Sequence, residues 1–198
     1  MSIVFGYVDK DKVYLASDNR MTDINGNFIS DEDVKIVVVN DKAAVAFAGN
    51  FGAQAFFLKC YKERPEYQNW FVNELAGNIW SMCDALVKMD MDWSQAIADS
   101  VACFLVAGKA KDNKVKLFAI TLKKRHIDLK EVQMMLFHPK DCEFMDCVNI
   151  LWKNIKLYSD DFAKRTIADV SKLSSLVRRS GNMWMYDIKR NESQFIVL

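Results

Sequence analysis

Residues 2–22 read SIVFGYVDKDKVYLASDNRMT, and this stretch predicts how the chain begins to fold. Apolar residues alternate with others over residues 2–8, and residues 9–12 are polar and typical of a turn. An apolar run then resumes over residues 13–16. A period of two on both sides of a short polar turn indicates a β-hairpin. We therefore expect the chain to open with two antiparallel strands.

The rest of the chain alternates between strand-like and helix-like segments. A second hairpin is expected at residues 35–48, after a polar segment whose Asn25-Gly26 pair is a turn signal. A 3.6-residue apolar period then indicates two helices, and strands, two helices and strands follow in turn. The expected elements are helices over 55–60 and 70–89, strands over 101–107, 115–122 and, after the basic turn 123–125, 132–137, helices over 144–155 and 162–176, and strands over 183–188 and 195–198.

This order of elements predicts an α+β fold. Helices with one apolar face must cover a sheet, and consecutive hairpins supply sheets that are mostly antiparallel. We expect two such sheets covered by pairs of helices, in one domain over residues 1–198. A chain of 198 residues with 51% hydrophobic residues and two prolines suits a single compact core.

Composition argues against several classes of partner. The formal net charge of +1 gives no long-range field for nucleic acid or an anionic membrane. Five cysteines, an odd number lying mostly in apolar runs, favour reduced thiols and a cytoplasmic protein. We expect no signal peptide and no membrane span. His126 and His138 are isolated, so neither a metal nor another cofactor is expected.

Ser2 is the first residue with a chemical role to consider. If Met1 is removed, Ser2 carries a hydroxyl nucleophile and a free α-amine on the same residue. An unperturbed α-amine has a pKa of about 7.7–8.0 and is a base near working pH. While Met1 remains, Ser2 has an amide in place of the amine, and the base is absent. Serine after the initiator methionine is also a common start of cytoplasmic proteins.

The stretch 2–22, together with KIVVVNDKAAVAFAGNFGAQ at residues 35–54, resembles the proteasome β-subunit family, which includes bacterial ring peptidases. In that family a nucleophilic Thr is followed by an Ala-Asp-x-Arg-x-Thr stretch, a Lys at a strand start and an Ala-Gly-Gly-like turn. The residues that match are Ser2, Ser17-Asp18-Asn19-Arg20-Met21-Thr22, Lys35 and Ala48-Gly49-Asn50. The resemblance implies the N-terminal nucleophile (Ntn) hydrolase fold, a four-layer αββα sandwich.

Each matching residue has a chemical role that the resemblance implies. Lys35 would bias the amine of Ser2 toward its neutral form, and Asp18 would offset the desolvation of Lys35 by pairing with it. The backbone N–H of Gly49 would form an oxyanion hole. Taken singly, Asp18 also suits a turn or cap, Lys35 a strand-edge charge and Gly49 an ordinary turn.

The resemblance also implies a substrate pocket. Met21, Phe47 and Phe51 would line the pocket for the residue that precedes the cleaved bond, although the two phenylalanines suit the core equally well. Thr22 and Gly49 would pair with an extended substrate backbone. The remaining substrate-binding candidate is Arg20, in the same motif.

Ser180-Gly181 resembles the family's Ser-Gly pair, whose serine helps to hold the nucleophile's amine. The pair also suits the C-terminal stop of a helix. Val177 stands where the family usually has Asp, and residues 137–140 do not resemble its Gly-Ser-Gly stretch.

The expected function is therefore hydrolysis of amide bonds, by a peptidase that acts through an acyl-enzyme on Ser2. The resemblance implies peptide or protein substrates, a homo-oligomeric ring and an ATPase or regulator as a further partner. Two alternatives stay open. One is a catalytically inactive structural or regulatory subunit, and the other is an acylase or transpeptidase whose acyl-enzyme is resolved by an amine.

Overall fold

The computed structural model describes residues 3–23, 25–159 and 161–198. The strand pairings within these ranges are all antiparallel, and they form two five-stranded sheets and one two-stranded ribbon. The chain has the α+β class predicted from its sequence.

The first sheet has the strand order β10-β1-β2-β11-β12. Its strands are β1 (Val4–Asp9), β2 (Lys12–Asp18), β10 (Met134–Phe137), β11 (Gly181–Asp187) and β12 (Glu192–Val197). The hairpin predicted at the start of the chain is confirmed, because β1 pairs with β2 from Val4 opposite Ser17 to Asp9 opposite Lys12. The ends of the chain thus contribute most of this sheet.

The second sheet has the order β5-β6-β7-β8-β9. Its strands are β5 (Ile36–Val38), β6 (Ala43–Gly49), β7 (Val101–Lys109), β8 (Val115–Lys123) and β9 (His126–Glu131). The predicted second hairpin is confirmed as β5–β6. Between β2 and β5 in the chain, β3 (Met21–Thr22) and β4 (Phe28–Ser30) form the two-stranded ribbon. Gly26 lies in the predicted turn with φ +94°.

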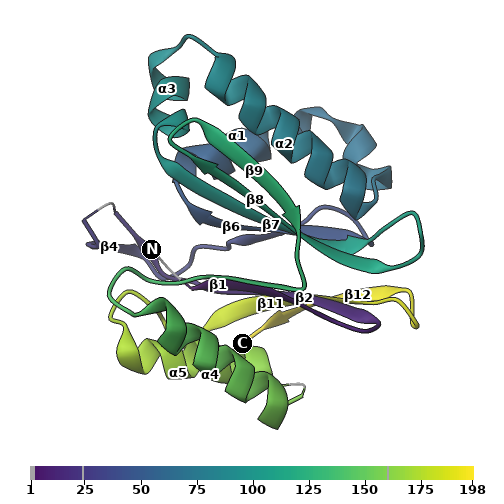
Figure 1. The fold of residues 1–198 in the computed structure, drawn as a ribbon, viewed down its shortest axis with the longest axis vertical. Helices are drawn as coiled ribbons and strands as arrows, with labels where there is room; N and C mark the ends of the chain where they lie inside the picture. Colours follow the sequence, from purple (N-terminus) through teal and green to yellow (C-terminus); the bar gives the residue numbers. More distant parts are fainter. Residues whose placement is uncertain (1–2, 24, 160) are drawn as a thin grey trace.

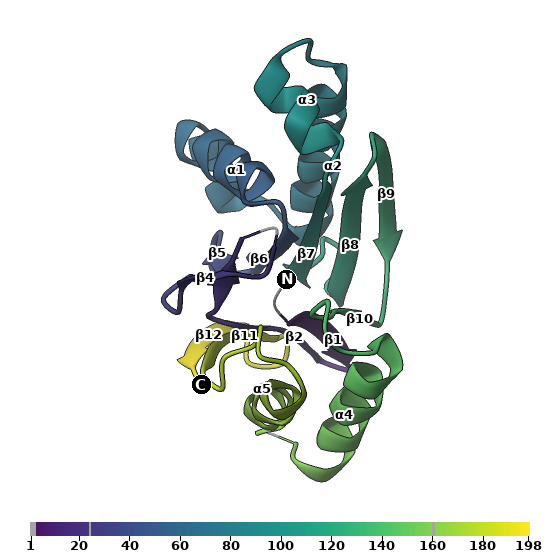
Figure 2. The ribbon, with the colours of Figure 1, turned by 90° about the vertical axis from the view of Figure 1, so that its left-hand side faces the viewer.

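The helices cover the outer faces of both sheets, as Figures 1 and 2 show. The helices on the second sheet are α1 (Phe51–Glu63), α2 (Val72–Lys88) and α3 (Asp92–Ala98), with the short 3-10 helix η1 (Pro65–Asn69) between the first two. The helices on the first sheet are α4 (Phe144–Leu157) and α5 (Phe162–Leu173).

Three groups of buried side chains hold these elements together. One group joins α1 and α2 to the second sheet, and another joins α4 and α5 to the first sheet. The third group lies between the two sheets and includes Leu15, Leu105, Leu117 and Trp184. We call this third group the inter-sheet core. Strand β7 is buried on both faces, which explains why its sequence is almost continuously apolar.

One strand of the second sheet was not predicted from the sequence. The segment after the basic turn at residues 123–125 forms β9, an additional strand that the sequence analysis did not predict. The next strand, β10, leaves that sheet and pairs with β1 in the other one. Strand β9 is at the sheet edge and mostly exposed, so its sequence lacks the apolar alternation of a half-buried strand.

The helix predicted over residues 162–176 ends earlier, at Leu173. Ser180 lies well beyond that helix, and Gly181 is the first residue of β11. The interpretation of Ser180-Gly181 as a helix stop is therefore wrong. The short helix α3 and the β3–β4 ribbon were also not predicted.

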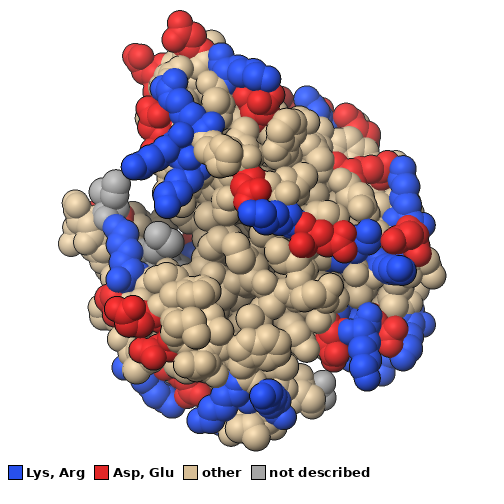
Figure 3. Space-filling model, viewed as in Figure 1, with Lys and Arg blue, Asp and Glu red and all other residues tan. Residues whose placement is uncertain are grey.

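The surface carries charges of both signs, mixed over the face shown in Figure 3. In the part of the chain that the structure describes, every helix is too short or too polar to cross a membrane.

Candidate active site

Asp18 ends strand β2, and its side chain is completely buried. Its Oδ1 accepts hydrogen bonds from the backbone N–H of Ile3 and from the Lys35 ammonium, both at 3.1 Å. Its Oδ2 accepts from the backbone N–H groups of Arg20 at 3.1 Å and Arg178 at 3.2 Å. Four donors thus surround the carboxylate, and hydrogen bonds of this kind favour its ionised form.

Lys35 immediately precedes β5, and its side chain is 8% exposed. The ammonium donates to Asp18 Oδ1 at 3.1 Å, to the Asp18 carbonyl at 2.7 Å and to the Arg20 carbonyl at 2.7 Å. An ammonium has three N–H donors, and each of them has an acceptor here. The sequence-based prediction that Asp18 and Lys35 form a buried pair is confirmed.

Burial acts on both members of this pair. It lowers the pKa of Lys35 below its ordinary value, and the charge of Asp18 opposes that shift. Burial likewise raises the pKa of Asp18, and Lys35 and the backbone N–H groups of Arg178 and Arg20 oppose that shift. The Lys35 ammonium therefore depends on the charge of Asp18 and on its three acceptors to stay cationic in this buried position.

Ser2 and Met1 lie outside the described residues. Ile3, which follows Ser2 in the chain, is joined to Asp18 by two hydrogen bonds. Its N–H donates to the carboxylate at 3.1 Å, and its carbonyl accepts from the Asp18 N–H at 3.2 Å. The segment directly after the predicted nucleophile is therefore held against the buried ion pair.

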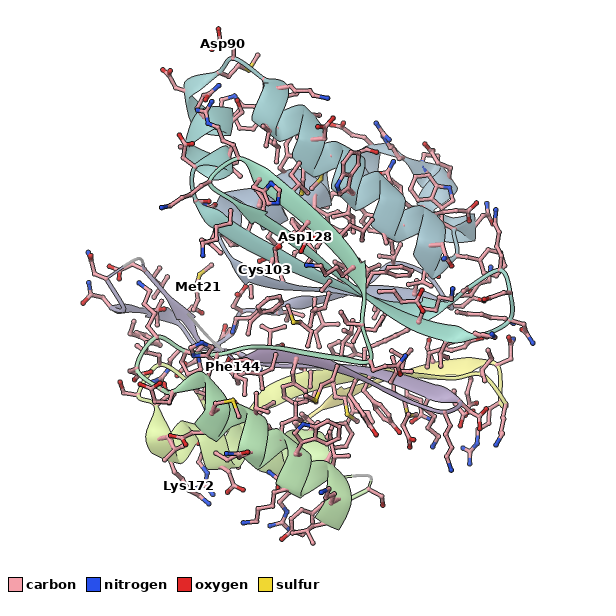
Figure 4. The ribbon with its side chains drawn as sticks, in the orientation of Figure 1. Met21, Asp90, Cys103, Asp128, Phe144 and Lys172 are labelled. Atoms are coloured by element: carbon pink, nitrogen blue, oxygen red, sulfur yellow. The ribbon has the colours of Figure 1, made fainter. Side chains whose placement is uncertain are left out.

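A cavity of about 80 Å³ adjoins Lys35. It brings together residues that the sequence analysis named as catalytic or substrate-binding, namely Met21, Thr22, Lys35, Phe47, Gly49 and Phe51. Figure 4 shows the Met21 side chain extending from the β3–β4 ribbon toward the second sheet. Segments on both sides of β5 in the sequence thus meet at one cavity.

The two phenylalanines of the cavity differ in burial. Phe47 is 4% exposed and packs against Phe57 and Phe104, with ring centroids 5.4 and 5.5 Å away. It therefore serves both as cavity wall and as core, the two roles that the sequence left open. Phe51 is 54% exposed at the start of α1, so it lines the cavity without filling the core.

Gly49 lies where β6 ends and α1 begins. Its φ is +93°, and a Cβ on this residue would lie 2.2 Å from the Val101 carbonyl oxygen. Only glycine fits both conditions. The next residue, Asn50, caps α1 by accepting a hydrogen bond from the Gly52 N–H at 2.7 Å. The cavity wall at Gly49 is therefore a tightly constrained backbone segment.

Arg20 does not line the cavity. Its Nε and Nη2 donate to the Asp31 carboxylate at 2.8 and 3.1 Å, and its Nη1 donates to the Ser175 carbonyl at 2.7 Å. Its carbonyl, by contrast, is one of the three acceptors of Lys35. Arg20 therefore supports the ion pair through its backbone, and contact with substrate stays a prediction.

Ser180 lies beside Asp18 without lining the cavity. Its carbonyl accepts from the Asn19 N–H at 3.3 Å, and the following Gly181 is opposite Asp18 in the sheet. The structure thus brings Ser180 to the same end of β2 as the ion pair. A role in holding an N-terminal amine stays a prediction.

The sequence analysis did not name two polar residues that also line the cavity, Asp33 and Gln54. Asp33 could have been found, because residues i and i+2 of an extended segment lie on the same side and Asp33 is two residues before Lys35. Gln54 follows Ala53 on helix α1, and no local signal distinguishes it from other helix residues.

No protein-family model matches this chain, and no curated protein matches it either. Within the described ranges, no group of three or more His, Cys, Asp or Glu side chains could hold a metal ion.

Proposed function

We propose that this protein is an N-terminal nucleophile hydrolase that cleaves amide bonds in peptides through an acyl-enzyme on Ser2, after removal of Met1. One observation carries the proposal. The buried Asp18–Lys35 pair is hydrogen-bonded to the N–H of Ile3, the residue that follows Ser2. Burying a lysine together with its carboxylate costs desolvation energy. Buried ionisable pairs of this kind are concentrated at functional sites.

The arrangement of layers supports the same family. Helices cover the outer face of each sheet, and the inter-sheet core separates the sheets. This agrees with a four-layer αββα sandwich, the fold that the resemblance implies. A cytoplasmic location, implied by the reduced cysteines, is part of the proposal.

In the proposed reaction the free α-amine of Ser2 takes the proton of its own hydroxyl, and the oxygen attacks the substrate carbonyl. The cationic Lys35 favours the neutral amine and stabilises the negative charge that develops. The N–H of Gly49 donates to the carbonyl oxygen as it becomes an oxyanion. The proton then passes to the leaving amine, and water hydrolyses the resulting ester and regenerates the Ser2 hydroxyl.

Intact mass spectrometry and a covalent probe test this proposal together. We expect the protein purified from its own cell to lack Met1 and to gain the mass of one β-lactone or peptide epoxyketone per chain. Lys35→Ala should slow this labelling by about 100-fold or more, because the group that keeps the amine neutral is removed. The matched control is Lys59→Ala, at an exposed position on α1, which should label at the wild-type rate.

Other outcomes separate the alternatives. A retained Met1 or an acetylated Ser2, with no labelling, would mean an inactive structural or regulatory subunit. Labelling followed by transfer of the acyl group to an added amine, in preference to water, would mean an acylase or transpeptidase. Labelling that is unchanged in Lys35→Ala would remove Lys35 from the mechanism.

We further propose that the chain assembles into a homo-oligomeric ring, with an ATPase or regulator as a further partner. Helix α4 carries several exposed large apolar side chains, which a monomer rarely leaves in contact with water. These are Phe144, Met145, Trp152 and Leu157. Light scattering should give the mass of several chains, and the mass of a single chain at micromolar concentration would contradict assembly.

A further inference from the structure

The wall of the cavity carries one charge of each sign. Among the described residues that line it, Asp33 and Lys35 are the charged ones. All three N–H donors of Lys35 are already used, and its charge is paired with Asp18. The charge of Lys35 acts on Asp33, but the close ion pair of Lys35 is with Asp18, and the Asp33 carboxylate remains open to a second cation at the cavity wall.

Asp33 is held in place by its backbone. Its N–H donates to the Asn19 carbonyl at 3.1 Å, which fixes this part of the chain beside β2. Its carboxylate is half-buried and has no hydrogen bond or ion pair with any residue that the structure describes. Burial raises the pKa of Asp33, and the charge of Lys35 opposes that shift. A carboxylate removed from water in this way gains from a cationic partner.

The other walls of the cavity are suited to a long aliphatic chain. Met21, Phe47 and Phe51 are apolar, and the buried Gln54 adds an amide to the wall. A lysine or arginine side chain combines an apolar stem with a charged end, and such side chains bury the stem while the charge meets a polar group. The cavity offers surfaces for both parts.

We infer that this cavity takes a lysine or arginine side chain of the substrate, with Asp33 as the residue that selects the cation. The inference rests on the proposed function, because it takes the cavity as the site of the residue preceding the cleaved bond. It also narrows that function, since cleavage would follow basic residues. Nothing in the motif that supports the hydrolase assignment requires an acid at position 33.

Peptide substrates that differ only in one ammonium group provide the test. We expect kcat/KM to be about 10- to 100-fold higher for lysine than for norleucine before the cleaved bond, the range of a hydrogen bond to a charged group. Asp33→Asn should reduce this preference to less than about threefold. The matched control is Glu32→Gln, which removes an exposed charge next in the chain and should keep the preference.

A binding measurement separates this inference from the proposed function. Acetylated tripeptide acids that end in lysine or norleucine represent the cleavage product, and calorimetry measures their affinity whether or not the protein hydrolyses peptides. We expect the lysine peptide to bind the wild type about 10-fold more tightly than the norleucine peptide does. The two peptides should bind Asp33→Asn with equal affinity. Equal binding of the two peptides to the wild type would overturn the inference. Tighter lysine binding without any hydrolysis would leave the inference standing and overturn the peptidase.

Discussion

The Asp18 carboxylate is enclosed by hydrogen-bond donors. Its carboxylate receives three backbone N–H groups and one ammonium, and these donors come from four separated parts of the chain. Removing the carboxylate leaves Lys35 buried without its counter-charge, whereas removing Lys35 leaves the carboxylate with its backbone donors. The two members of the pair are therefore not equivalent.

We predict that Asp18→Ala lowers the free energy of unfolding by about 3–5 kcal/mol, the usual cost of leaving a buried charge unpaired. Asp18→Ala combined with Lys35→Met should be more stable than Asp18→Ala alone, because the orphaned ammonium is gone. Urea denaturation of the two single variants and the double variant measures this. Strictly additive effects would show that the ion pair carries no coupling energy.

Gly49 provides a second prediction for a single residue. Gly49→Ala should destabilise the protein by about 2 kcal/mol or more, because φ is +93° and the new Cβ would meet the Val101 carbonyl oxygen. Gly77→Ala is the matched control. Gly77 lies inside helix α2 with no atom within 4 Å of a new Cβ, so alanine should stabilise the helix by about 0.5–1 kcal/mol. Thermal unfolding gives the change in melting temperature for both variants, and equal changes would contradict the prediction.

The connecting segments around the site are joined by charged side chains. The Asp31 carboxylate accepts from Arg20, and Arg178 donates to the Asp31 carbonyl at 3.0 Å and approaches its Oδ2 at 3.4 Å. Arg20 also donates to the carbonyl of Ser175, beyond α5. This cluster ties the segment after β2 and the segment after β4 to the one before β11. The contribution of this cluster to the free energy of unfolding should depend on pH.

The hydrogen bonds from Arg20 lower the pKa of Asp31 below its ordinary value of 3.8. The folded state therefore binds this proton less tightly than the unfolded state. The stabilisation is present in full above the unfolded-state pKa and is lost as the pH falls through the folded-state pKa. We predict that Asp31→Asn costs about 1–2 kcal/mol at pH 7 and that the difference from wild type shrinks below about pH 4. Urea midpoints measured from pH 2.5 to 7 test this, and a difference independent of pH would contradict it.

The sequence predicted most of the elements because their side chains follow a clear apolar period. It predicted β7, with its buried run, and α2, whose apolar face is buried. It did not predict β9, whose residues face water at a sheet edge, or α3, which has seven residues. Both are too exposed or too short for a period to stand out, and their neighbours in space stabilise them instead.

In the molecule as a whole, the inter-sheet core holds the two sheets and their helices together. We predict that Leu105→Ala, which opens a cavity in this core, lowers the free energy of unfolding by about 2–5 kcal/mol. Leu129→Ala on β9 is the control, because Leu129 is 37% exposed and its loss should cost about 1 kcal/mol or less. Equal losses by urea denaturation would mean that the inter-sheet core contributes little.

The sequence by itself determines the local structure of most of the chain. The opening hairpin, the junction at Gly49 and the helix pairs all follow from turn residues and from periods of 2 and 3.6, because backbone geometry sets those periods within a few residues. The pairing of Asp18 with Lys35 was predicted as well, from the desolvation cost of a buried lysine and from the resemblance described above.

Only the tertiary structure decides the contacts between segments that are far apart in the chain. The pairing of β10 with β1, the donation from Arg178 to Asp18 across 160 positions, and the cavity wall at Asp33 depend on how the sheets and the segments around them come together. No local pattern encodes these contacts, because they join segments that are far apart in sequence and form only when the apolar faces pack.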